Sequence, residues 1–305
     1  MISKALIDRL YEAASIQRWN DHVRPMDFTE LDKQAHKAFI AWLLARLEEL
    51  AGSEPIDMAL MAEGSVFGLL ERAVLTDIKA PVFHVLKERA GPAIDAYLLD
   101  VLREELAPLS GDLTHLFARW LQDPEYAPRE KRLLRAAHYL ATRWEFAIVH
   151  HTAPFLHGVA STRRAIDAEI AQHRDLEGVR RLECDGPERG FVDLVGQLRF
   201  QLRWAGTPRI PQTSVLGHSF VVAALAWLAT VDRQENDVLR GSNWLGGLFH
   251  DLPEALTRDI VAPVKHSIPG LDAEVTRLED TYVRDHLLPL LPLALHAEVL
   301  HLVED

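Results

Sequence analysis

The chain has 305 residues, of which 48% are hydrophobic and 26% charged, and its formal net charge is −12. A chain of this length and hydrophobicity can bury a large core, which excludes a disordered protein and favours two domains over one. The negative charge argues against binding to a nucleic-acid polymer, although a single pocket can still be locally positive.

The first residues and the single cysteine bear on where the protein acts. Cys184 alone allows neither an internal disulfide nor a cysteine-based zinc site. The first twenty residues mix both charges and lack the apolar run of a signal peptide. We find no uncharged apolar stretch of about 18 residues, so we expect no membrane span. These features together predict a cytoplasmic protein.

Apolar residues recur at helical spacing along most of the chain, and no segment reads as a strand pair with a hairpin turn. We therefore predict an all-α fold. The expected helices cover, in chain order, residues 34–50, 93–107, 129–149, 160–175, 215–230 and 271–288. Proline and glycine mark expected helix ends near 52–55, 91–92, 107–111, 124–128, 206–211 and 263–270.

An internal repeat relates the two halves of the chain. At a shift of 182 residues, VFGLLERAVLTDIKAPVFH (66–84) aligns without a gap with LFHDLPEALTRDIVAPVKH (248–266). The same shift aligns His36 with His218. We therefore predict an internal duplication, with one copy in residues 1–183 and the other in 190–305. The boundary is expected near 180–192, in the stretch RLECDGPERG.

The two copies differ at ionisable residues. Gly68-Leu69 stands where the second copy has His250-Asp251, and Arg72 stands where it has Glu254. The first copy therefore reads as a degenerate unit without metal ligands, which we expect to act as a structural partner of the second. We also expect structural roles for its histidines, His36, His84 and His138.

Residues of the second copy suit a metal site. His218 opens the apolar helix at 215–230, directly after two potential capping residues, Thr213 and Ser214. His250 and Asp251 follow about thirty residues on, and Glu254 lies four residues after His250, on the same face of a continuing helix. Two imidazoles and a carboxylate suit a borderline divalent metal, which activates water for attack on a phosphate.

The pattern His…His-Asp…Asp resembles the signature of the HD-domain metal-dependent phosphohydrolases. It is closest to the bacterial 5′-deoxynucleotidase branch, in which an Arg-Trp pair precedes the first His. There the His-Asp is followed by a Glu, a Thr-x-Asp and Pro-Val-Lys. The matching residues here are Arg203-Trp204, His218, His250-Asp251, Glu254, Thr257-Arg258-Asp259 and Pro263-Val264-Lys265. The resemblance covers residues 190–305, with 15–150 as the degraded copy, and implies a helical HD-domain bundle.

The resemblance also implies a role for each matching residue. One divalent metal ion (Co, Mn, Mg, Fe, Ni or Zn) would be held by His218, His250 and Asp251. Glu254 would act on the attacking water, and Asp259 would support the substrate or the site. Arg203, Trp204 and Lys265 would bind the substrate, the two cations facing its phosphate. The implied reaction removes phosphate from a deoxyribonucleoside 5′-monophosphate.

Three departures from the family pattern stand out. Gly217 replaces the glutamate that often precedes the first histidine, and Arg258 replaces the glycine of Thr-Gly-Asp. The family's fourth metal ligand, an aspartate on a later helix, would fall beyond residue 305. The HD domain is therefore expected to continue past this residue, unless Glu304 or Asp305 substitutes.

Other readings of the sequence remain open. The chain could be a nucleotide-binding regulatory protein with weak or no catalysis. It could also be an HD hydrolase that acts on nucleoside triphosphates or phosphodiesters. Because the family commonly forms dimers, we expect either a homodimer or packing of the two copies as a pseudo-dimer within one chain.

Overall fold

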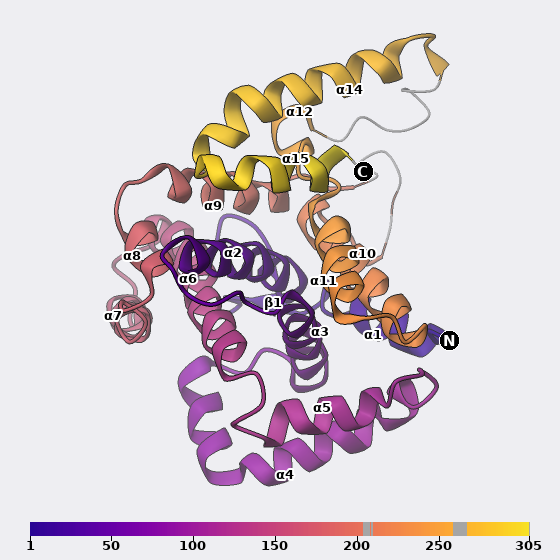
Figure 1. The fold of residues 1–305 in the computed structure, drawn as a ribbon. Coiled ribbons are helices and arrows are strands. Elements are labelled where there is room, and N and C mark those ends of the chain that lie inside the picture. The colour runs from indigo at the N-terminus through magenta and orange to yellow at the C-terminus, as the bar shows by residue number, and fades with distance from the viewer. Residues whose placement is uncertain (204–207, 209, 259–266, 305) are drawn as a thin grey trace.

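The computed structural model describes residues 1–305 except 204–207, 209, 259–266 and 305, and the side chains of residues 80, 81, 84 and 304 (Figure 1). The described residues confirm the all-α class. Their only strands are β1 (Gln17–Arg18) and β2 (Phe28–Thr29), which pair antiparallel.

The helices of the first half are α1 (Lys4–Glu12), α2 (Glu30–Leu50), α3 (Met58–Leu75), α4 (Ala80–Leu106), α5 (Leu113–Gln122), α6 (Pro128–Thr152), α7 (Val159–Ala171) and α8 (Glu177–Glu183). Those described in the second half are α9 (Pro187–Gln197), α10 (Val215–Asp232), α11 (Asp237–Phe249), α12 (Glu254–Thr257), α14 (Leu271–Tyr282) and α15 (His296–Glu304). Short helical turns follow α9 at η1 (Leu198–Phe200) and join α14 to α15 at η2 (Val283–Leu287), η3 (Leu288–Leu290) and η4 (Leu293–Leu295).

Helix α2 runs through the middle of the molecule and contacts α3, α6, α8, α9 and α10 (Figure 1). It starts where the hydroxyl of Thr29 accepts a hydrogen bond from the backbone N–H of Asp32 at 3.2 Å. Nearly all of its residues as far as Leu47 are buried, so it is a core helix on every face rather than an amphipathic surface helix.

The two halves share one hydrophobic core. The ring of Phe249 on α11 lies 4.9 Å from that of Phe39 and 4.8 Å from that of Trp42, both on α2. The ring of Phe67 on α3 likewise lies 5.8 Å from that of Trp227 on α10. In addition, helix α2 packs on α10, and α3 packs on α11. Each of these pairs joins elements that the repeat aligns with one another.

Local backbone geometry also matches between aligned positions. Thr76 and Arg258, which the shift of 182 residues aligns, both have positive φ, with φ/ψ of 58°/−158° and 66°/158°. Their N–H groups donate to the carbonyls of Arg72 and Glu254, again aligned residues, at 2.9 Å in both cases. The internal duplication and its boundary stay predictions. The stretch 180–192, where the boundary is expected, includes residues 184–186 between α8 and α9.

The expected helix end near residues 91–92 corresponds to a break within α4. The span Ala80–Leu106 consists of two helical segments that meet at a kink, where Ala90 is non-helical at φ −134° and Pro92 follows. Proline cannot donate a backbone hydrogen bond, so the helical hydrogen bonding is interrupted there.

Helix α10, Val215–Asp232, is long and apolar enough by length and composition to cross a membrane, although we expected no such segment. It is 67% buried within the fold and packs against α2 and α11. Its contacts are those of a core helix, and its first turn carries a residue of the candidate metal centre.

Candidate metal centre

The chain before α10 fixes both Arg203 and His218. The backbone N–H of Arg203 donates to the carbonyl of Thr213 at 3.0 Å, and that of Val215 donates to Gln201 at 2.9 Å. The hydroxyl of Ser214 then caps α10 by accepting from the N–H of Gly217 at 2.9 Å, as the sequence predicted. This short backbone pairing places Arg203 beside the helical turn that carries His218.

Helix α11 ends at the second histidine. Its last residue is Phe249, and His250 is its C-cap. Pro253 has no N–H to donate to the carbonyl of Phe249, so the chain turns and α12 begins separately at Glu254. The expectation that one continuous helix carries His250 and Glu254 is therefore wrong.

A close helix contact brings α11 to α10. A Cβ atom added to Gly247 would lie 2.7 Å from the Cα of Ala223, so only glycine allows this approach. Gly247 lies one turn before His250 and Ala223 lies shortly after His218. The small residue therefore controls how closely the two histidines approach each other.

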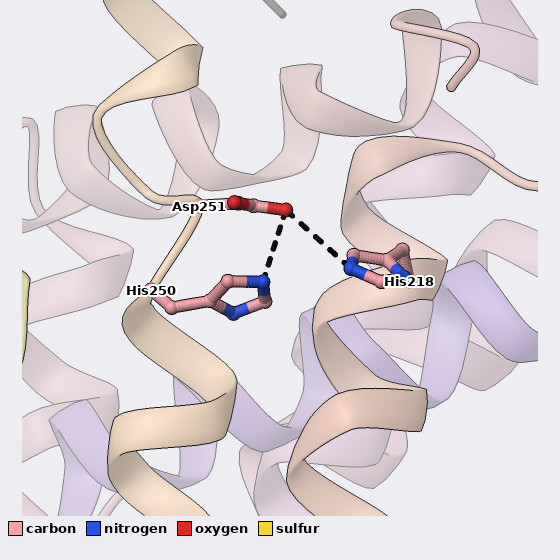
Figure 2. A group of neighbouring side chains, drawn as sticks. All are labelled: His218, His250 and Asp251. Atoms are coloured by element: carbon pink, nitrogen blue, oxygen red, sulfur yellow. Dashed lines mark ion pairs between the residues drawn. The ribbon is translucent and has the colours of Figure 1, made fainter. Parts of the chain in front are cut away.

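His218, His250 and Asp251 point toward one another (Figure 2). The carboxylate oxygen Oδ2 of Asp251 lies 3.1 Å from Nε2 of His250 and 3.7 Å from Nε2 of His218. One ligand atom from each residue lies within 4.8 Å of the other two, and all three side chains are partly buried. The structure thus brings together the three residues predicted as metal ligands.

Hydrogen bonding and burial act on all three residues of this group. The Nδ1 of His250 lies within hydrogen-bond distance of the carbonyl of Gly247, at 2.9 Å, which orients the ring with Nε2 toward Asp251. Burial and the charge of Arg203 lower the pKa of His218 to about 4. Burial opposes ionisation of Asp251, but the hydrogen bond from His250 and the nearby positive charges outweigh it and lower its pKa.

These donors fit a divalent metal ion. One nitrogen from each imidazole and a carboxylate oxygen lie within 4.8 Å of one another, an arrangement that a divalent cation stabilises. The bond from His250 to a backbone carbonyl is the outer contact that metal-bound histidines usually make. The NH1 of Arg203 donates to Oδ2 of Asp251 at 2.9 Å and supplies positive charge there.

The other predicted site residues divide into two groups. Glu254 begins α12 just after the histidine–aspartate turn, where its backbone carbonyl accepts from Nε2 of Gln201 at 3.0 Å. Trp204, Asp259 and Lys265 lie outside the described residues, as do Asp305 and the side chain of Glu304.

The structure bears on two departures from the family pattern, at Gly217 and Arg258. A Cβ atom on Gly217 would lie 2.9 Å from Oδ1 of Asp32 and 3.1 Å from the side chain of Leu31, so a glutamate does not fit there. Arg258 has φ 66°, in the region that favours glycine. The turn after α12 therefore keeps a glycine-like backbone although its residue is arginine.

A groove of about 1290 Å³ reaches His250 and was not predicted. Its walls come from both halves, with Arg46 and residues between 53 and 59 on one side and α10, α11 and α15 on the other. No local signal marks residues 53–59 as neighbours of His250, because their approach depends on how the halves pack.

Comparison with known proteins agrees with this geometry. Residues 195–305 match the family model of the HD domain. This match supports an HD domain in the second half of the chain, a type of domain found in metal-dependent phosphohydrolases. The match does not reach the first half, and it does not define a branch of the class. Searches of the curated proteins and of the solved structures found no similar protein.

Proposed function

We propose that the HD domain removes phosphate from a (deoxy)nucleoside 5′-monophosphate with the help of one divalent metal ion. The observation that carries this proposal is the convergence of His218, His250 and Asp251 within 4.8 Å, beside the guanidinium of Arg203. The donor set suits the metal, and the arginine suits the phosphate.

A bound divalent ion would lower the pKa of water at this site and balance charge on the phosphate. Side chains of the protein bind the phosphate and accept the proton. A guanidinium has five N–H donors, so Arg203 can hold Asp251 and a phosphate oxygen together. Glu254, whose N–H donates to the carbonyl of Asp251 at 3.1 Å, is the carboxylate we assign to take the proton from the attacking water.

The groove beside His250 supports a substrate larger than phosphate. Its volume of about 1290 Å³ is larger than that of most pockets for small molecules, and the groove is open to solvent. A nucleoside could lie along it while its phosphate faces Arg203. This placement of the substrate is part of the proposal.

Phosphate release from a panel of deoxynucleoside monophosphates, with cobalt or manganese added, tests the proposal. We expect turnover that chelation abolishes and that is lost in His250→Ala and Asp251→Asn. His115→Ala serves as the matched control, since His115 is an exposed histidine on α5. If the metal-loaded chain turns over none of the nucleotides, the proposal is wrong.

The product separates the remaining possibilities. Pyrophosphate or tripolyphosphate would show a nucleoside triphosphate as the substrate, and a monoester product would show a phosphodiester. Tight nucleotide binding without hydrolysis, unchanged by His250→Ala, would instead show a regulatory nucleotide-binding protein.

A further inference from the structure

A cluster of buried cations lies in the first half of the chain. Lys33 and Lys37 are one turn apart on α2 and are 0% and 7% exposed. Lys33 contacts Nδ1 of His138 on α6, and Nζ of Lys37 lies 3.3 Å from the amide oxygen of Gln34. The guanidinium of Arg72, on α3, lies over the ring of Phe83 at 4.5 Å. Hereafter Lys33, Lys37 and Arg72 are called the cationic cluster.

Among the described residues, no carboxylate forms an ion pair with any of the three members of the cationic cluster. Glu30, Glu71 and Asp77 act on it through charge alone. Glu30 already accepts from NH1 of Arg18 at 2.8 Å and from the amide of Gln34 at 2.6 Å. Glu71, farther along α3, pairs with Lys87 at 2.8 Å. Buried charges are normally paired, so this excess of positive charge in a protein of net charge −12 needs an explanation.

Burial without an ion-pair partner lowers the pKa of both lysines. Desolvation lowers the pKa of Lys37 to about 8 and lowers that of Lys33 well below its usual value. Glu30 raises both pKa values, but it does not offset desolvation. An anion placed at the cationic cluster would restore the charged form of both side chains.

The repeat places the cationic cluster where the second half has its metal centre. Gly68 aligns with His250, and Arg72 aligns with Glu254. A Cβ atom on Gly68 would lie 3.1 Å from Nζ of Lys37, so the lysine ammonium lies beside the aligned ligand position. The Arg-Trp pair is retained as Arg18-Trp19. The first half has thus exchanged metal ligands for fixed cations and kept the arginine.

The cationic cluster has an edge at the protein surface. Lys33 is fully buried, but Gly68 and Arg72 on α3 are partly exposed, as are Arg18 and Trp19 on and beside β1. Arg18 is only 11% exposed in its side chain and is paired with Glu30 at 2.8 Å and Glu145 at 3.0 Å, so an anion would share this arginine with two carboxylates. Arginine and lysine together are the usual side chains for binding a phosphate group.

We propose that the first half binds a phosphate-type oxyanion without metal, at Lys37, Arg72 and Arg18. The anion is either free phosphate or the 5′-phosphate of a nucleotide, and the site is separate from the metal centre. Because Arg72 and Lys37 occupy positions aligned with residues of the HD domain, the first half would be a second ligand site rather than only a structural partner.

Calorimetry and thermal unfolding of the chelator-treated full chain test this site. Inorganic phosphate and a deoxynucleoside monophosphate are compared with sodium chloride at equal ionic strength. We expect phosphate or the nucleotide to bind and to raise the melting temperature. Loss of one charged partner in Lys37→Met or Arg72→Gln should weaken that binding by about tenfold or more. Equal responses to the two probes indicate free phosphate, and a response to the nucleotide alone indicates a nucleotide.

Three control variants separate this site from the metal centre and from a general loss of charge. Arg164→Gln removes an exposed arginine of α7 and should leave binding unchanged. In His250→Ala and Arg203→Gln, which disable the HD site, the metal-free binding that remains is assigned to the cationic cluster. Lys37→Met replaces an unpaired buried charge by a side chain of similar length, so its fold should be at least as stable without anion. The proposal is overturned if phosphate and nucleotide act no differently from chloride, or if Arg203→Gln abolishes binding and Lys37→Met does not.

Discussion

The hydroxyl of Ser214 donates a hydrogen bond to Oδ1 of Asp32, and these two residues are aligned with each other by the repeat. A contact between aligned positions is expected where two related units meet about an approximate twofold axis. Asp32 lies in the first turn of α2, and Ser214 is the N-cap of α10. His218 lies in the first turn of α10. We therefore propose that the halves form a pseudo-dimer and that this bond ties the first half to the metal centre.

Asp32→Ala should lower the free energy of unfolding by about 1–3 kcal/mol, because it removes the acceptor of a buried hydroxyl. Urea denaturation measures the change. In the double variant Asp32→Ala with Ser214→Ala, the loss should be smaller than the sum of the single losses. Both substitutions remove this bond, and Ser214→Ala also removes the cap of α10. The control is Asp27→Ala, in an exposed pair with Arg24 at 2.9 Å, which should cost less than about 1 kcal/mol. Additive losses would show that the Asp32–Ser214 bond does not stabilise the fold.

Arg203→Gln should keep the metal and lose catalytic efficiency. The arginine contacts Asp251 through one N–H group, whereas the metal donors are His218, His250 and Asp251. Removal of a charged hydrogen bond to the phosphate should lower kcat/KM about 10- to 100-fold. Metal content by elemental analysis and steady-state phosphate release are measured together, with Arg164→Gln as the control. An unchanged kcat/KM would remove Arg203 from the phosphate site.

The sequence predicted the fold class and singled out His218, His250 and Asp251, which the structure groups together, because both depend on local patterns. Helical spacing of apolar residues is read along one segment, and His218, His250 and Asp251 stand in a recognisable string. The helix break at Pro253 was missed because the i+4 spacing of His250 and Glu254 looked continuous.

Features that depend on tertiary packing could not be predicted. Lys33 and Lys37 occur in ELDKQAHKAF, a segment whose charges suggest an exposed face, yet α2 is enclosed by other helices. The groove at His250 likewise needs Arg46 and the 53–59 segment to approach from the other half. Neither feature leaves a signal within one segment of the chain.

Arg258→Gly should stabilise the protein. Arg258 has φ 66° and ψ 158°, and its aligned residue Thr76 has φ 58° and ψ −158°. This backbone region costs a residue with a Cβ about 1–3 kcal/mol. Glycine also has more conformational entropy in the unfolded chain, which offsets part of this stabilisation. We therefore expect the free energy of unfolding to rise by about 1 kcal/mol.

Thr76→Gly should give a similar gain in the same denaturation experiment. Thr162→Gly, within helix α7, is the control and should lose about 0.3 kcal/mol, because glycine is less favourable than threonine inside a helix. Destabilisation by both Arg258→Gly and Thr76→Gly would show that the arginine and threonine side chains stabilise these turns by more than the backbone conformation costs.

Glu63 should make stability fall as the pH rises. It is 5% exposed, and burial raises its pKa to about 7, although the hydroxyl of Tyr126 donates to its Oε1 at 2.8 Å and Arg240 and Arg119 lower the pKa. The unfolded value is 4.5, so between pH 4.5 and 7 the folded state holds more protons than the unfolded state. The stability that the protonated carboxyl contributes is therefore complete below pH 4.5 and is lost as the pH rises through 7.

Glu63→Gln removes this titration and keeps a carbonyl oxygen for the Tyr126 hydroxyl. We expect the variant to be more stable than the parent by about 1–3 kcal/mol at pH 8 and nearly equal to it at pH 4. Denaturant unfolding at both pH values measures the difference, in which contributions from other titrating groups cancel. Glu125→Gln, an exposed glutamate close in sequence to Tyr126, is the control and should change little at either pH. A parent protein more stable than Glu63→Gln at pH 8 would mean that Glu63 is ionised and paired in the fold.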